Sequence, residues 1–515
     1  MARCDDIEPE VVEQHTEEDM EKMGSRAPSA RVSEVMSPDA SEGPSSSQSS
    51  HRLLAYSDAL ISIIATVMIL PVAHTPVETS EELRQSLQVL LSTKIAVYLM
   101  TFLIVSMAWA AHSRLFQVVI RIDDNLALFN LVCMMLITLL PYTFSLMAAF
   151  PENVLGILLF CGCVMVIGLV QTVIVLYAFS RPHLLHPQLQ GSPDLSHYQH
   201  HILRVILRVP LMCLLASLAA SVCFQLSYVL LAIVIFLPYM SRCLQWARSR
   251  VLGPVEESPE ELLLYSFLPH EPLSKERLEA FSDGVYAIVA TLLILDICED
   301  NVPDSLLVSQ RFNGSLVAAL RSYGPEYLAY FGSFVTVGLL WFVHHSLFLH
   351  VTKVTRLMGL LNTFCLAFVG GLPLAYQLTH EFPRHSQNEL EAIQISCVII
   401  FFAGLFQLCI WVVALYNQHE CLQPNVRFGG SEHLLMLAKL WLYPCVALGT
   451  FLLTCVLSQF SAPIFHLMEL TVPLAFLLLR LLLNLLLGLV HLLLLQLRPS
   501  SSEGGSTSSY SAVDT

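Results

Sequence analysis

The sequence predicts an all-α polytopic membrane protein made of two parallel six-helix repeats, with twelve transmembrane helices per chain. Three observations support this prediction. Of the 515 residues, 55% are hydrophobic and 13% are charged, with a mean hydropathy of +0.64, whereas soluble proteins have about 25% charged residues. Apolar runs near the length that crosses a bilayer as a helix recur along the chain. The third observation is that sequence motifs of the first half return in the second.

The apolar runs divide the chain into five parts. Residues 1–50 are acidic and rich in serine, and residues 497–515 are rich in serine, so we expect both to be disordered cytosolic tails. The first repeat is expected at 51–250, a cytosolic linker at 251–273 and the second repeat at 274–496. The predicted spans are 53–73, 94–116, 126–149, 153–180, 204–226 and 228–245, then 279–297, 323–350, 355–380, 390–417, 434–459 and 463–495.

The duplication is clearest in a box of aliphatic residues around an aspartate. The stretch AYSDALISIIATVMIL at 55–70 returns as AFSDGVYAIVATLLIL at 280–295. Later residues recur at a constant offset, such that Trp109, His112, Phe116, Asn130 and Pro141 match Trp341, His344, Phe348, Asn362 and Pro373. Each repeat has an even number of predicted spans, so both enter the membrane from the same side and are parallel.

The basic residues predict the orientation. When the N-terminus is placed in the cytosol, the inner connections hold more Arg and Lys than the outer ones. Both termini are then cytosolic. The sequon Asn313-Gly314-Ser315 falls in the loop after the seventh span, on the lumenal side, where Asn313 is a candidate glycosylation site.

The box aspartates lie near the predicted cytosolic ends of their helices. A charge within a span costs about 2.5–3.5 kcal/mol on insertion scales, so it needs partners. We expect one buried polar network per repeat, which pins three helices together. Its members are Arg52, Ser57, Asp58, His112 and Asn130 in the first repeat, and Arg277, Ser282, Asp283, His344 and Asn362 in the second. A proton relay or ion site on the same residues is the alternative.

An aliphatic stripe runs along another face of each box helix. It contains Ile63, Thr66, Val67 and Leu70 in the first copy, and Ile288, Thr291, Leu292 and Leu295 in the second. Packing between helices explains such a stripe, and so does a narrow apolar pore, which blocks ions by losing its water. No TVGYG filter is present. His74, at the lumenal end of the first span, is a candidate pH sensor because histidine titrates near pH 6.5.

The R-x-x-x-[FY]-S-D box occurs twice, at Arg52–Asp58 and at Arg277–Asp283. With the two six-helix repeats and the WxxH segment, it resembles the family of endolysosomal potassium channels known as transmembrane protein 175. The resemblance implies a homodimer in which four box helices surround one pore. It implies potassium selectivity, proton conduction when the lumen is acidic, and residence in endosomes and lysosomes. It also implies a constriction at Ile63 and Ile288, with Leu70 and Leu295 nearer the lumen.

Some expectations follow from this channel hypothesis. The hydroxyls of Thr66 and Thr291 are candidates to contact a partly dehydrated ion. No cofactor is expected besides the permeant K⁺ and H⁺, and no bound metal. The expected partners are a second copy of the chain, membrane lipid and a regulatory protein of unknown nature. Nucleic acid is not expected, because the net charge is −15 and no dense basic patch exists.

Two other function classes compete with a channel. One is a secondary cation/proton transporter that uses Asp58 and Asp283. Transporters typically have broken helices or charges at the membrane midplane, whereas these aspartates lie towards one end and the box helix has no proline before Pro71. The other is an intramembrane enzyme, which we do not expect because the sequence has no GxGD-like pair, no HExxH and no recognisable Ser-His frame.

Overall fold

The computed structural model describes residues 45–70, 83–150, 152–186, 195–233, 274–300, 302–381, 387–428, 432–457 and 461–497. These residues form helices and short turns, and the only extended pairing among them is two isolated bridges, Val119–Leu185 and Val351–Leu422. The predicted linker at 251–273 and the predicted pH sensor His74 lie outside the described residues, as does most of the predicted span 228–245. The described part of the chain is therefore all-helical, as predicted.

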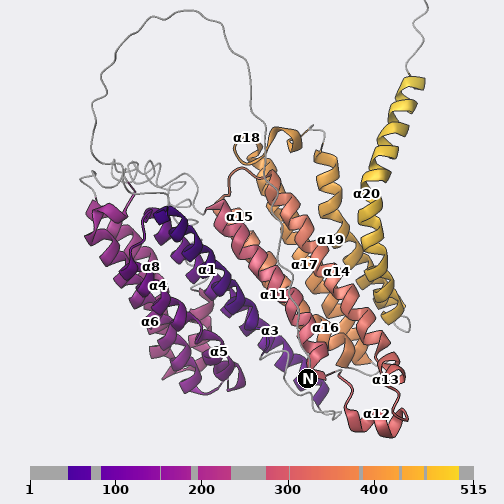
Figure 1. Cartoon of the computed structure of the whole chain (residues 1–515), viewed down its shortest axis with the longest axis horizontal. Coiled ribbons are helices and arrows are strands. Elements are labelled where there is room, and N and C mark those ends of the chain that lie inside the picture. Colours follow the sequence, from indigo (N-terminus) through magenta and orange to yellow (C-terminus); the bar gives the residue numbers. More distant parts are fainter. Residues whose placement is uncertain are drawn as a thin grey trace, which may run out of the picture. The chain divides into compact units, whose positions relative to one another are not determined.

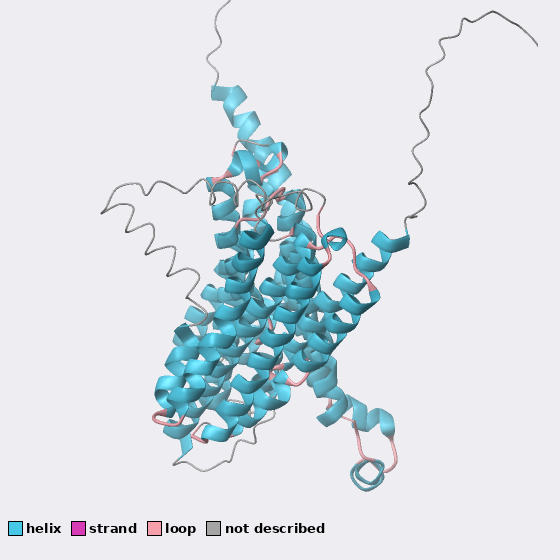
Figure 2. Ribbon diagram, turned by 90° about the vertical axis from the view of Figure 1, so that its left-hand side faces the viewer, coloured by secondary structure: helices cyan, strands magenta, loops and turns pink. Residues whose placement is uncertain are grey.

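The helices of the first half are α1 (Ser45–Val67), α3 (Leu83–Val118), α4 (Asp124–Ile137), α5 (Leu140–Ala149), α6 (Val154–Ser180), the 3₁₀ turn η1 (Pro182–Leu184) and α8 (Leu195–Ala220). Those of the second half are α11 (Lys275–Asp300), α12 (Ser305–Arg311), α13 (Leu316–Ser322), α14 (Gly324–His350), α15 (Arg356–Val369), α16 (Leu372–Glu381), α17 (Gln387–Tyr416), α18 (Gln418–Cys421), the 3₁₀ turn η2 (Pro424–Val426), α19 (His433–Val456) and α20 (Ser461–Leu497). Figure 1 labels these elements, and Figure 2 shows the long helices running side by side.

Nine helical segments within the described ranges are long and apolar enough to cross a membrane, and two further apolar helices there are shorter, Phe224–Ile233 and Pro463–Leu479. The chain is thus a multi-pass membrane protein, and the twelve-span layout stays a prediction. The helix α1 begins at Ser45, before the predicted start of the first repeat at residue 51. The last residues of the predicted disordered tail therefore belong to the first helix.

The third predicted span of each repeat consists of two helices instead of one. In the first half α4 ends at Ile137 and α5 begins at Leu140, and in the second half α15 ends at Val369 and α16 begins at Leu372. The matched prolines Pro141 and Pro373 occupy the second position of the new helix. Proline has no backbone N–H to continue the preceding helix, which explains why both spans break here.

The two box helices α1 and α11 pack against each other. They come close at Gly284 of α11, where a Cβ atom would collide with the Ser62 hydroxyl of α1. A glycine at this position allows the two backbones to come close, as small residues do between membrane helices. This contact fixes the relative position of the two box aspartates, Asp58 and Asp283.

Candidate functional site

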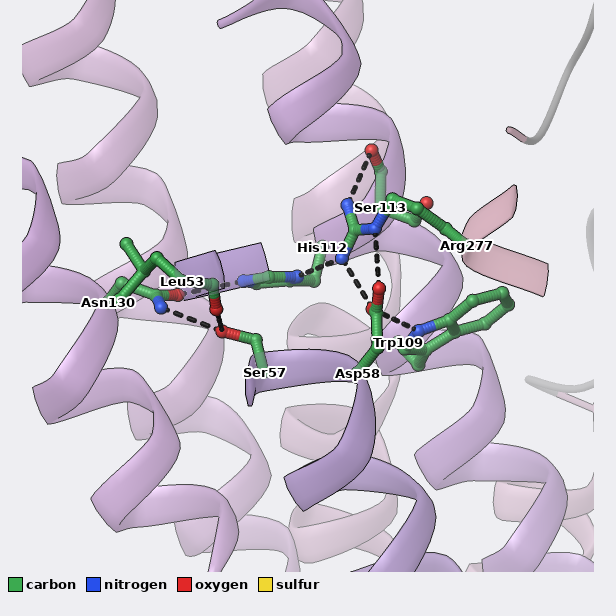
Figure 3. A network of polar contacts seen from close by, with 8 residues as sticks. All are labelled: Leu53, Ser57, Asp58, Trp109, His112, Ser113, Asn130 and Arg277. Atoms are coloured by element: carbon green, nitrogen blue, oxygen red, sulfur yellow. Dashed lines mark hydrogen bonds and ion pairs between the residues drawn. The ribbon is translucent and has the colours of Figure 1, made fainter. Parts of the chain in front are cut away.

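The carboxylate of Asp58 is the centre of a buried polar network in the first repeat (Figure 3). It lies on α1 with only 2% of its side chain exposed. Trp109 of α3 donates its indole N–H to Oδ1 of Asp58 over 2.8 Å. The strongest partner is Arg277, whose Nε and Nη2 atoms bind the two carboxylate oxygens over 2.9 and 2.6 Å. A two-point guanidinium–carboxylate pair of this kind compensates the burial of the charge.

Arg277 belongs to the second repeat, at the start of α11, yet it completes the network of the first. Besides Asp58, its Nη1 donates to the carbonyl oxygen of Ser113 over 3.3 Å, and its Nη2 lies 3.2 Å from Nδ1 of His112. The expectation of one self-contained network per repeat is wrong in this respect. Packing of α11 on α1 brings Arg277 to the neighbouring helix, whereas Arg52, the residue expected there, is exposed.

A second chain of hydrogen bonds joins α1, α3 and α4. Nε2 of His112 lies 2.8 Å from Oδ1 of Asn130, and the amide of Asn130 donates to the Ser57 hydroxyl over 2.9 Å. That hydroxyl donates to the carbonyl oxygen of Leu53 over 3.0 Å. Because Arg277 has only donors, Nδ1 of His112 is the acceptor, and the imidazole is neutral with its proton on Nε2. Every member of this chain has a partner.

The second repeat builds the same chain from the matched residues. Nε2 of His344 lies 2.8 Å from Oδ1 of Asn362, whose amide donates to the Ser282 hydroxyl over 2.9 Å. Trp341 donates its indole N–H to Asp283 over 2.8 Å. The difference is at the carboxylate: Asp283 is exposed, and no guanidinium of the described residues binds it. Within one chain, the second network is therefore incomplete.

An apolar groove lies beside Asp283, between α11 and α14. Its volume is about 350 Å³, and its walls are Tyr286, Ala287, Ala290, Phe334, Val337, Gly338 and Trp341. In the first repeat the matched residues Phe102, Val105 and Trp109 are buried. Trp109 is covered by Phe281 of α11, with ring centroids 4.4 Å apart. Tyr56, which matches Phe281 in the box, is 52% exposed.

The aliphatic stripes of α1 and α11 are partly open to the surface. Ile63 is 37% exposed and Leu295 is 55% exposed, while Ile288 and Leu70 are half-buried. These side chains are candidate pore residues because they lie on the two helices that meet at Gly284.

The two threonines of the stripe differ from each other. Thr66 is fully buried, and its hydroxyl bonds the backbone of its own helix at Ile63 and Ser62. Thr291 is exposed, with its hydroxyl donated to the carbonyl oxygen of Ile288 over 2.8 Å. The expectation of two equivalent pore-facing hydroxyls is therefore wrong for Thr66, because the packing of α1 turns this part of the helix inwards.

Two further observations concern the predicted sites. Asn313 is exposed on the turn between α12 and α13, with φ of +49°, so it is accessible to modification. Among the described residues, no group of three His, Cys, Asp or Glu side chains could hold a metal ion. Trp109 and Trp341 are network members that the sequence reasoning left out, although their constant offset had already marked them as matched.

Comparison with known proteins gives consistent results. A family model described as "Endosomal/lysosomal potassium channel TMEM175" matches residues 52–141 and 277–373, the first three predicted spans of each repeat. A zebrafish (Danio rerio) protein named endosomal/lysosomal proton channel TMEM175 is 70% identical over 94% of this chain and 94% of its own length. The human protein of that name is 61% identical over 88% of this chain and 90% of its own. A Streptomyces collinus protein named a potassium channel is 38% identical over 26% of this chain and 62% of its own.

Proposed function

The chain belongs to the TMEM175 family, and from this premise we propose that it is a cation channel of endosomes and lysosomes that conducts K⁺ and, when the lumen is acidic, H⁺. The names of its relatives support both ions, since those from animals are named proton channels and the bacterial one a potassium channel. These relatives are channels and not enzymes. Both termini are cytosolic in this proposal.

The pore of the proposed channel is formed by α1 and α11 of two copies. One difference between the two polar networks supports this proposal: within one chain the first network is complete and the second is not. Arg277 and Phe281 of α11 complete the site at Asp58 and Trp109. Their counterparts on α1, Arg52 and Tyr56, are exposed.

A second copy of the chain supplies the missing partners. Arg52 of one copy binds Asp283 of the other, as Arg277 binds Asp58 within the chain, and Tyr56 stacks on Trp341 beside the apolar groove. The same contact is then made four times around one axis. This arrangement surrounds a central path with two α1 and two α11 helices, in keeping with closed symmetry in homo-oligomers.

The constriction of this path is formed by Ile63 and Ile288, with Leu70 and Leu295 as a second layer. Their partial exposure in a single chain supports this role, because a pore-lining side chain has no protein neighbour on one side. A ring of aliphatic side chains excludes water when narrow and admits ions when slightly wider. The Thr291 hydroxyl lies one turn beyond Ile288 and contacts an ion that has lost part of its water.

The transporter alternative, in which Asp58 and Asp283 exchange ions, fits the geometry less well. Both oxygens of Asp58 are occupied by Arg277, and Oδ1 also by Trp109. A carboxylate held in this way would have to break several charge-assisted bonds in each cycle. Its role in the proposal is to hold the helices together.

Currents from enlarged lysosomes, recorded under separate K⁺ and H⁺ gradients, test the pore. Ile63→Asn with Ile288→Asn should wet the constriction and raise the current several-fold, while Ile120→Asn, at an isoleucine that is 43% exposed between α3 and α4, should leave it unchanged. A wild-type reversal potential that follows neither gradient would refute the channel. An unchanged current in the double variant would refute the constriction.

Exchanging the charges of Arg52 and Asp283 tests whether these two residues pair between two copies of the chain. Arg52→Asp and Asp283→Arg should each reduce the dimer fraction of the purified protein, measured by light scattering after gel filtration. Combined in one chain, the two changes should restore it, because opposite charges face each other again. Glu152→Arg, at an exposed acid in the turn before α6, is the control for charge change alone. Failure of the combined variant to recover would contradict this pairing.

A further inference from the structure

Another buried carboxylate lies in the membrane part of the chain, away from the box helices. Glu469 on α20 is 9% exposed. Its Oε2 atom lies 3.1 Å from Nδ1 of His466, one turn earlier, and the Ser333 hydroxyl of α14 donates to Oε1 over 3.4 Å. A Cβ atom at Gly332 of α14 would lie only 2.7 Å from the carboxylate. The absence of a side chain at Gly332 is what makes room for this acid.

Glu469 borders a small cavity between α14, α16, α17 and α20. Five of its eleven lining residues carry hydroxyl groups, namely Ser333, Thr336, Tyr376, Thr379 and Ser396. The volume open to the centre of a water molecule is about 20 Å³, and about 10–15 Å³ is enough for one water. The cavity is only partly enclosed, so a water molecule there can link the carboxyl group with the outside.

The groups that face Glu469 include one base and no permanent cation. On its own helix this base is His466, and α14 contributes the Ser333 hydroxyl. The helices α16 and α19 contribute the phenols of Tyr376 and Tyr443. The helix α17 contributes the Ser396 hydroxyl. Its two acids, Glu389 and Glu391, precede Ser396 by seven and five positions and do not line the cavity. None of the described side chains that line the cavity is Arg or Lys.

We propose that Glu469 and His466 form a proton-binding site at the end of the second repeat where α20 begins. In the predicted orientation this end faces the lumen. The pair shares one exchangeable proton when the lumen is neutral and takes up a second from lumenal water when the lumen is acidic. No electron moves, and the pair changes from a net charge of zero to +1. This inference rests on the proposed function only in placing the site on the lumenal side and in expecting an effect on the current.

The difference in exposure between the two side chains explains where the second proton can be held. His466 is 45% exposed, whereas Glu469 is 8% exposed as a side chain. A charged imidazole at the surface keeps most of its water, and a protonated carboxyl is the cheaper form in a buried position. Histidine is also the side chain that ordinarily changes charge between about pH 5 and pH 8. The second proton therefore leaves the buried member neutral and the exposed member charged.

The site is one helix away from the proposed pore. Glu469 contacts α14 at Gly332 and Ser333, and α14 packs on α11, the helix that carries Ile288. A change of charge in the pair alters how α20 holds α14. Lumenal protons thereby act on the second repeat.

Thermal unfolding of the purified full-length protein tests the site without any current. Between about pH 7.5 and about pH 5, the wild type should gain stability relative to Glu469→Gln, because the buried carboxyl of the folded protein holds a proton in this range, whereas a glutamate of the unfolded chain, with a pKa of about 4.3, does not. His466→Gln should keep a gain, because the buried carboxyl still takes up a proton, but should move it to higher pH, because the imidazole that favours the carboxylate is gone. The double variant should follow Glu469→Gln. Glu420→Gln, at an exposed acid on α18, should follow the wild type. Parallel melting profiles for wild type and Glu469→Gln would overturn the site, and if that variant does not fold, a wild-type profile in His466→Gln would do the same.

Current recordings at different lumenal pH values test whether the Glu469–His466 pair affects conduction. Glu469→Gln and His466→Gln should each shift the midpoint of the lumenal pH dependence by about half a pH unit or more, and Glu420→Gln should not. If wild-type current is present and both variants keep its pH profile, the link to conduction is refuted. If the wild type carries no current at all, the channel proposal fails, while the melting profiles still decide whether the site binds a proton.

Discussion

Replacement of Arg277 by alanine should destabilise the fold in a way that depends strongly on pH. The substitution removes the two hydrogen bonds to Asp58 and the contacts with Ser113 and His112. It leaves the Asp58 carboxylate, 2% exposed, without its counter-ion. A buried acid in this position takes up a proton instead of remaining charged.

The magnitude follows from the cost of that proton. A carboxyl group with the ordinary aspartate pKa of about 3.9 costs about 1.36 kcal/mol to protonate for each pH unit above that value. The cost is about 4 kcal/mol at pH 7, within the ~3–5 kcal/mol typical of breaking a buried pair, and about 1.5 kcal/mol at pH 5. For a cooperative unit of about 200 residues, roughly 2–4 °C per kcal/mol, the melting temperature falls by roughly 8–16 °C at pH 7 and 3–6 °C at pH 5.

The assay is thermal unfolding of wild type and Arg277→Ala at the two pH values, followed by tryptophan fluorescence. The control adds Asp58→Asn to Arg277→Ala; the neutral amide needs no proton, so the loss of stability should become nearly independent of pH. If Arg277→Ala lowers the melting temperature equally at pH 7 and pH 5, the unpaired carboxylate is not the cause, and the reasoning is refuted.

Three further substitutions have defined outcomes. Gly284→Ala should lower the melting temperature by an amount equivalent to about 1–3 kcal/mol, because its Cβ collides with Ser62; Ser62→Gly in the same chain should recover most of it. Gly370→Ala should be destabilising because its Cβ meets the Tyr98 hydroxyl, and adding Tyr98→Phe should cost less than the sum of the two single changes; an additive result would exclude this contact as the cause. Asn313→Gln should abolish a glycosidase-sensitive mobility shift on gels of protein from animal cells, and a shift that persists would exclude this asparagine as the acceptor.

The helical class and the Ser, Asp, His and Asn members of the polar networks could be predicted from the sequence, because hydropathy and a constant offset are local signals. The two tryptophans were left out of that prediction. The helix that supplies the arginine of the first network could not be predicted from the sequence. Six positions separate Arg52 from Asp58, which places them about 120° apart around the helix, unlike the three or four positions that bring side chains together. This spacing already argues against a pair within one helix. Which neighbouring helix supplies the guanidinium depends on long-range packing at Gly284, for which no local pattern exists.

The same limit applies to the threonines of the stripe. The sequence treats Thr66 and Thr291 as equivalent, since both lie three positions after a matched isoleucine. The structure buries one and exposes the other, because the contact between α1 and α11 uses different sides of the two helices. A repeat in sequence therefore predicts matching positions well and matching surroundings poorly.

The separation of 219 positions between Asp58 and Arg277 has a consequence for biosynthesis. At about 5–20 residues per second, a ribosome needs roughly 10–45 s to translate this interval. The newly made first half spends that time in the bilayer before its arginine exists. A nascent chain that stops before α11 thus carries an unneutralised acid, a feature by which cellular quality control can distinguish truncated products from complete ones.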